Sequence, residues 1–92
     1  MIRSFACRDT ELVFRREFSR KFNAIARAAH RKLLVLNRAT RLDDMRFPPG
    51  NRLEALRGDL AGRYSVRIND QWRIVFAWRD DEPHEVEIID YH

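Results

Sequence analysis

The residues of this chain that are best suited to chemistry lie in its last third. Residues 62–78, GRYSVRINDQWRIVFAW, carry arginines on the face opposite the apolar residues, and the sequence ends in Asp90, Tyr91 and His92. A guanidinium binds phosphate through two parallel hydrogen bonds. An imidazole gives or takes a proton near neutral pH. A purely structural sheet does not need this combination, whereas a site that handles a phosphate does.

Metal-free RNA cleavage is one reaction that these residue types could support. It needs a base for the 2′-OH proton, a cation for the charge on the phosphorus centre and an acid for the departing 5′ oxygen. The candidate cations are Arg73 and Arg57. The candidate proton-transfer groups are Asp90, Tyr91, His92 and Glu54.

Each candidate also has a purely structural interpretation. Arg73 and Asp90 would form an ion pair, the Tyr91 hydroxyl would cap a backbone group, and Glu54 would be a surface acid. His92 would be a frayed terminus, as terminal residues often are. The residues alone leave these alternatives open.

Other chemistries lack their sequence signatures. The three histidines are far apart and have no CxxC or HExxH spacing around them, so no zinc site is expected. The chain has no glycine-rich phosphate loop and no GxSxG elbow. Cys7 is the single cysteine, which rules out an internal disulfide. No cofactor is therefore expected.

Length and charge point to one small domain with a polyanionic partner. The 92 residues predict a single domain spanning 1–92. Residues 1–50 hold 12 basic and 5 acidic residues, a net charge of +7, whereas residues 51–92 hold 6 and 9, a net charge of −3. The basic half would attract RNA or an acidic protein. The sequence has no long apolar run, so neither a membrane span nor a signal peptide is expected. A cytoplasmic location is therefore favoured.

Helical patterns dominate the first half of the chain. Asp9 or Thr10 is a candidate N-cap for a first helix over ELVFRREF, in which Phe14 and Phe18 would share a face. A second helix is predicted from an apolar stripe at helical spacing. That stripe consists of Phe22, Ile25, Ala26, Ala29, Leu33 and Leu36. Its basic residues form either a solvated face or a footprint for RNA or an acidic partner.

Strand patterns dominate the second half. Ile2–Phe5 is a candidate edge strand, residues 40–51 form a loop with two prolines, and residues 51–58 form a short turn or helix. Alternation then predicts a hairpin whose three-residue loop, 69–71, pairs Ile68 with Trp72. Arg67 would then lie opposite Arg73, a like-charged pair that needs an anion or a carboxylate from another strand. A regular last strand would separate Tyr91 from Asp90. Trp72 and Trp78 would belong to the core.

The segment RLEALRGDLAGRYSVRINDQWRIVFAW, followed by VEIIDYH, resembles the HigB toxins of the RelE-like superfamily. The pattern LxxLxGDxxGxxSxRINxxWRIxF and the terminal DYH carry the resemblance, and MIRSF and PPGNRL also fit. It implies an α+β fold, with two N-terminal helices packed on a mainly antiparallel sheet of about four strands.

The resemblance also implies a function. Such toxins are bacterial and cytoplasmic, cleave mRNA on the ribosome without a metal, and so stop translation. Their partners are a HigA-type helix-turn-helix antitoxin, the ribosome and mRNA, with operator DNA bound only through the antitoxin complex. Carried over to this sequence, Arg73 would stabilise the phosphate, while Asp90, Tyr91 and His92 would transfer protons or position substrate. Substrate binding would involve Arg57, Arg67 and Arg63.

One departure from the family concerns Glu54, because some members have a histidine at this position. A carboxylate there could serve as the base, but it repels phosphate. Either Glu54 is the base or the C-terminal residues act without it. The alternative function is a growth inhibitor that binds the ribosome or RNA without cleaving it, or an attenuated toxin that acts mainly as a co-repressor with its antitoxin.

Overall fold

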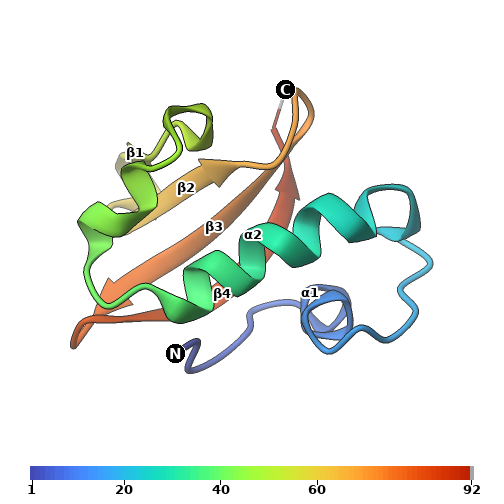
Figure 1. Ribbon diagram of the computed structural model, residues 1–92. Coiled ribbons are helices and arrows are strands. Elements are labelled where there is room, and N and C mark those ends of the chain that lie inside the picture. Colours follow the sequence, from blue (N-terminus) through green and yellow to red (C-terminus); the bar gives the residue numbers. More distant parts are fainter. Residues whose placement is uncertain (92) are drawn as a thin grey trace.

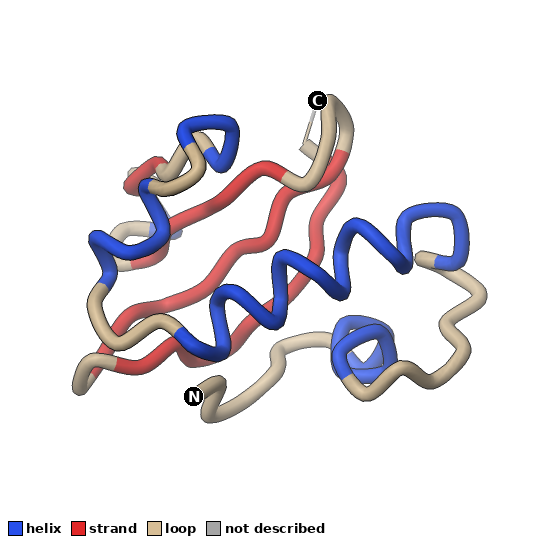
Figure 2. The backbone as a smooth tube through the Cα atoms, viewed as in Figure 1, coloured by secondary structure: helices blue, strands red, loops and turns tan. Residues whose placement is uncertain are grey.

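Two helices cover one face of a four-stranded antiparallel sheet in the computed structural model, which describes residues 1–91 (Figures 1 and 2). The helices are α1 (Arg8–Phe14) and α2 (Ala26–Arg38). The strands, in their order across the sheet, are β1 (Glu54–Ala55), β2 (Arg63–Arg67), β3 (Trp72–Arg79) and β4 (Glu82–Asp90). The 3₁₀ turns are η1 (Asn23–Ile25), η2 (Leu42–Arg46), η3 (Pro49–Asn51) and η4 (Gly58–Leu60). The predicted α+β class is confirmed.

The β2–β3 hairpin has the predicted register. Arg67 pairs with Arg73, and the Ile68 amide donates to the Trp72 carbonyl at 2.9 Å. The side chain of Asn69 shapes the three-residue loop, because its Oδ1 accepts from the amides of Gln71 and Trp72 at 2.9 and 2.8 Å. An Asn side chain that bonds its own backbone two residues on is a common turn device. The alternation of apolar and polar residues along the two strands therefore determines which side chains face the helices.

The core lies between the helices and the inner face of the sheet. Strand positions Val66, Ile74, Phe76, Val86 and Ile88 pack with Val13 of α1 and with Ala29, Leu33 and Leu36 of α2. Trp72 and Trp78 pack against this cluster, as predicted. Burial of such apolar side chains supplies most of the stability of a small domain.

Helix α1 begins earlier than the sequence indicated. Its N-cap position is Cys7, and no side chain caps it. The predicted caps, Asp9 and Thr10, have other partners: Asp9 accepts from the Ser19 hydroxyl at 3.1 Å, and Thr10 Oγ1 accepts from the Ile88 amide at 2.9 Å. The prediction of an Asp9 or Thr10 cap was wrong because tertiary hydrogen bonds claim both side chains.

The ends of the predicted helices also differ. Helix α1 stops at Phe14, so Phe18 lies in the following loop with 71% of its surface exposed instead of sharing a helical face with Phe14. Phe22 precedes helix α2 and is buried against Trp72, with ring centroids 5.4 Å apart. Phe22 fits the apolar stripe because its side chain is buried, although the residue itself is not helical.

Two short segments complete the sheet. Residues 51–58 contain strand β1 in place of the expected turn or helix, and Glu54 pairs with Ser65. The N-terminal residues run along the outer edge of β4, but Ile2–Phe5 forms only an isolated parallel bridge from Phe5 to Val86 and not the predicted edge strand. Neither helix in residues 1–91 has the length and apolar character needed to span a bilayer.

Candidate functional site

Arg73 forms the centre of the candidate site. It lies in β3 on the face of the sheet that points away from the helices, because its neighbours Trp72 and Ile74 face the core. Only 5% of its surface is exposed. A buried guanidinium requires partners for its charge and its N–H groups, and these partners define the site.

Two of the three guanidinium nitrogens are held by neutral oxygens. Nε donates to the Ser65 hydroxyl at 2.9 Å, and NH2 donates to the carbonyls of Arg52 and Ser65 at 2.5 and 3.3 Å. NH1 faces Oε1 of Glu54 at 3.7 Å, an ion-pair distance that is too long for a hydrogen bond. NH1 is therefore the nitrogen best placed to receive an anion.

Glu54 reaches Arg73 from across the neighbouring strand. The β1–β2 register places Glu54 beside Ser65, and Ser65 lies on the Arg73 face of β2. About half of the Glu54 side chain, 48%, is exposed to solvent. Of the two compensating groups expected for the Arg67–Arg73 pair, an anion or a carboxylate from another strand, the structure provides the carboxylate for Arg73. Arg67 is compensated by Asp70 of the hairpin loop.

Tyr91 covers Arg73 from the C-terminal side. Its ring centroid lies 5.1 Å from the guanidinium carbon, and its amide donates to the Gln71 carbonyl at 2.6 Å. The residue is 44% exposed. A ring over a guanidinium stabilises the cation through its π face, and the exposed part remains accessible to a ligand.

Asp90 belongs to the other face of the sheet. It pairs with Trp72, whose ring packs in the core, and Gln71 Nε2 donates to its Oδ2 at 3.2 Å. Residues paired across antiparallel strands share a face. The register therefore separates Asp90 from Tyr91, as predicted for a regular strand. His92, the third terminal candidate, lies outside the described residues.

The structure does not gather the three candidate substrate-binding arginines in one place. Arg67 lies directly opposite Arg73. Arg57 is exposed and precedes η4. Arg63 lies four residues before Arg67 on β2, roughly 13 Å away at the usual strand rise, and pairs with Glu85 and Glu87 at 3.6 and 3.8 Å. Arg67 is thus adjacent to the Arg73 site, whereas Arg63 is held at the far end of its strand.

Residues 14–92 match a family model described as the RelE-like toxin of the type II toxin–antitoxin system HigB. The chain belongs to this family. It is 47% identical over 58 residues to Toxin HigB-1 of Vibrio cholerae serotype O1, a match that covers 63% of this chain and 61% of that toxin. An uncharacterized protein of Haemophilus influenzae is 35% identical over 52 residues, which cover 56% of this chain and 52% of that protein. The matched segment thus spans less than two thirds of either relative.

The fold comparison agrees with the family. The YoeB–YefM complex from Staphylococcus aureus contains a chain that superposes with a TM-score of 0.62 at 22% sequence identity, covering 100% of this chain and 95% of that one. At this identity the likeness concerns the fold alone. It places the HigB-family chain in the RelE-like architecture of two helices on a four-stranded antiparallel sheet.

A second layer of residues, which sequence reasoning missed, supports the site of this HigB-family chain. Asn51 is fully buried, and its Nδ2 donates to the carbonyls of Met45 and Phe47 at 3.2 and 2.9 Å. Its Oδ1 accepts from Nζ of Lys32 on α2. Asn51 thereby fixes the loop whose next residue, Arg52, supplies a carbonyl to Arg73. The only sequence signal for this role was a polar residue, Asn51, directly after the PPG segment. Its partner Lys32 lies 19 residues earlier and could not be inferred from the local sequence.

Lys32 shows that the surroundings of this loop are positively charged. Burial lowers the pKa of its ammonium group, and the nearby charges of Arg31 and Arg67 lower it further. Only the part of this shift that comes from the two arginines reports positive charge nearby. Arg67 therefore connects the Arg73 site to a basic edge of α2.

The arrangement provides one buried cation, a carboxylate beside it and an aromatic ring above it. Such a set can bind a phosphate at NH1, accept a proton at Glu54 and stack a base or sugar on Tyr91. Within residues 1–91, no three His, Cys, Asp or Glu side chains gather as metal ligands would.

Proposed function

We propose that this chain is an endoribonuclease toxin that cleaves mRNA on the ribosome by 2′-OH attack on the phosphate, and so inhibits translation in the bacterial cytoplasm. The observation that carries the proposal is Arg73, a buried cation whose NH1 lies 3.7 Å from the half-exposed Glu54 and whose guanidinium carbon lies 5.1 Å from the centre of the exposed Tyr91 ring. Membership in the HigB family supports the same reaction.

The proposed mechanism divides the work among the residues of the site. Arg73 NH1 stabilises the charge that develops on the phosphate oxygens, and its other nitrogens are already fixed, so little reorganisation is needed. Glu54 takes the 2′-OH proton. Tyr91 or His92 protonates the departing 5′ oxygen and stacks on the substrate. Asp90, on the opposite face, holds the end of β4 through Gln71 and so positions Tyr91.

The proposed partners follow from the same function. An antitoxin of the HigA type neutralises the toxin, and operator DNA is bound through the complex. The basic residues Arg57, Arg67 and Arg63 contact ribosomal RNA and mRNA. Phosphate contacts of this kind weaken with rising salt.

Growth arrest after induced expression tests the site assignment. Arg73→Met is expected to reduce cleavage by about 10²- to 10³-fold, the usual effect of losing one transition-state donor, and to relieve the arrest. Deletion of residues 91–92 should relieve it as well. Arg79→Met, an exposed arginine of the same strand, is the matched control and should remain toxic. Full toxicity of both site variants would remove Arg73 and Tyr91 from the mechanism.

Glu54 requires its own test because a carboxylate beside NH1 also competes with phosphate. If it is the base, Glu54→Ala loses cleavage and retains folding. Unchanged toxicity of Glu54→Ala would exclude Glu54 from catalysis. Greater activity of Glu54→His than of the natural chain would show that the carboxylate slows the reaction.

The position of Glu54 also favours the second candidate function, a toxin that binds without cleaving or acts mainly as a co-repressor. In this case Glu54 occupies the anion-binding side of Arg73 and keeps phosphate away from it. Mapping of mRNA 5′ ends after induction separates the two functions. New ends in phase with codons support cleavage, whereas stalled but intact messages support binding alone.

A further inference from the structure

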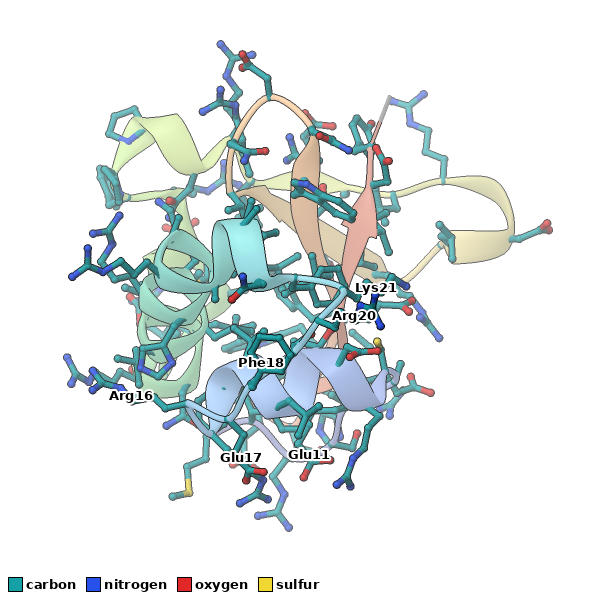
Figure 3. The ribbon with its side chains drawn as sticks, turned by 90° about the vertical axis from the view of Figure 1, so that its right-hand side faces the viewer. Glu11, Arg16, Glu17, Phe18, Arg20 and Lys21 are labelled. Atoms are coloured by element: carbon teal, nitrogen blue, oxygen red, sulfur yellow. The ribbon has the colours of Figure 1, made fainter. Side chains whose placement is uncertain are left out.

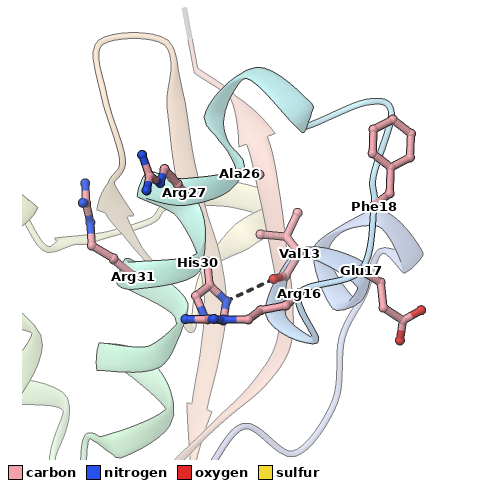
Figure 4. Close-up of a pocket in the computed structure, with 8 residues that line it drawn as sticks. All are labelled: Val13, Arg16, Glu17, Phe18, Ala26, Arg27, His30 and Arg31. Atoms are coloured by element: carbon pink, nitrogen blue, oxygen red, sulfur yellow. Dashed lines mark hydrogen bonds between the residues drawn. The ribbon is translucent and has the colours of Figure 1, made fainter.

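A pocket of about 550 Å³ lies between α1, α2 and the loop that joins them, on the helical layer of the molecule (Figure 4). Its lining residues are Val13, Arg16, Glu17, Phe18, Ala26, Arg27, His30 and Arg31. Arg73 faces the opposite side of the sheet. The pocket is therefore separate from the candidate nuclease site, and its occupant need not be RNA.

The pocket has an apolar floor with an aromatic ring at one side. Val13 and Ala26 contribute the floor, and Phe18 projects from the loop with 71% of its surface exposed. Figure 3 shows Phe18 over α1, between Arg16 and Glu17 on one side and Arg20 and Lys21 on the other. An exposed ring beside an apolar hollow is typical of a surface that buries a partner's apolar side chain.

The rim of the pocket is positively charged. It contains three arginines, Arg16, Arg27 and Arg31, against the single carboxylate of Glu17. Arg27 and Arg31 lie one turn apart on α2 and are both exposed. An occupant with acidic groups on both sides of an apolar group would match this arrangement.

Hydrogen bonds hold one side of the rim in place. Arg16 Nε donates to His30 Nε2 at 3.1 Å, and His30 Nδ1 lies 3.1 Å from the Val13 carbonyl. Because an arginine can only donate, Nε2 is the acceptor and Nδ1 carries the proton that binds Val13. The chain of contacts ties α2 to the end of α1. Little ordering is then required when a partner binds, which favours affinity.

We propose that this pocket binds a protein segment in which acidic residues flank a large apolar side chain. The apolar residue enters between Val13 and Phe18, and the carboxylates pair with Arg27 and Arg31. The apolar floor of Val13 and Ala26 beside the exposed Phe18 ring suits an aliphatic side chain, which a protein segment has and an RNA strand lacks, so a protein is favoured over RNA. The inference concerns the helical layer and does not depend on RNA cleavage at Arg73.

Titration of the full chain with a synthetic peptide tests the proposal. The peptide carries one leucine flanked on both sides by glutamates, and amide NMR shifts locate the bound peptide. Shifts should concentrate at Val13, Phe18 and Ala26, and binding should weaken with salt. Two control peptides replace the glutamates with lysines or the leucine with serine, and neither should bind.

Matched variants separate the pocket from general charge. Phe18→Ser and Arg27→Glu should each weaken peptide binding by about tenfold, as expected for loss of an anchoring contact. Phe47→Ser, which replaces an aromatic residue that is 68% exposed elsewhere, and Arg38→Glu, on the same helix, should leave binding unchanged. Absence of peptide binding would overturn the proposal, as would equal binding to Phe18→Ser. Shifts at the pocket produced by an oligouridine strand in place of the peptide would assign the surface to RNA and also overturn it.

Discussion

Replacement of Ser65 by alanine tests the idea that the sheet holds Arg73 in a preset orientation. Ser65 is fully buried, and its hydroxyl accepts the Nε–H of Arg73 at 2.9 Å. The substitution removes the acceptor and leaves a charged donor without it in a buried position. A hydrogen bond to a charged group contributes about 1.5 to 3 kcal/mol to the free energy of unfolding.

Thermal unfolding followed by circular dichroism provides the measurement. A loss of about 2 kcal/mol corresponds to a fall in Tm of roughly 8 to 16 °C for a domain of this size. The same substitution should lower cleavage, because the guanidinium gains freedom to turn and NH1 is no longer held beside Glu54.

A double-mutant cycle decides whether the effect acts through Arg73. With Arg73→Met as the background, Ser65→Ala should cost well under 1 kcal/mol, because the donor is gone and an apolar pair remains. Equal destabilisation in both backgrounds would refute the reasoning, since the loss would then come from packing at Ser65 alone.

Three further changes probe the elements around the site. Asn51→Ala should destabilise the fold by about 2 kcal/mol, because the carbonyls of Met45 and Phe47 lose their donor and the first of these bonds is buried. It should also lower cleavage, because Arg52 supplies a carbonyl to Arg73; urea unfolding and an RNA cleavage assay check this. Thr10→Val should cost about 1 to 3 kcal/mol in urea unfolding, because it deprives the Ile88 amide of its acceptor. The pKa of Asp44 is held below its ordinary value by hydrogen bonds from the backbone amides preceding η2. That stabilisation is present above the ordinary carboxyl pKa and is lost as the pH falls below about 4, so Asp44→Asn should flatten the acid limb of a plot of Tm against pH. An unchanged acid limb would argue against it.

The sequence predicted the sheet well because strand alternation is a local property. Two observations were enough to pair Arg67 with Arg73: the apolar residues of both strands must share a face, and a three-residue loop begins at Asn69. The need for an anion or a carboxylate near that pair then followed from charge alone, and the Glu54 carboxylate meets it. These inferences required only the strand period and Coulomb's law.

The parts that the sequence did not predict depend on long-range contacts. Thr10 resembles an N-cap, but its hydroxyl binds β4, which is 78 residues away in the chain. Asn51 resembles an ordinary loop residue, yet it joins α2 to the support of the site. Phe22 matches the helical period while lying outside the helix. In each case a tertiary partner overrode the local preference.

The burial of Arg73 determines which substitutions can abolish toxicity without unfolding the protein. Arg73 and Arg67 are like charges on adjacent strands, and Arg73 is almost fully desolvated, so its charge opposes folding. Selection for cells that survive toxin expression should then yield variants with an apolar residue at position 73. These variants should remain fully folded, because the substitution removes the desolvation cost of the buried charge. Inactive alleles of this type would keep every other surface intact, including the pocket between the helices.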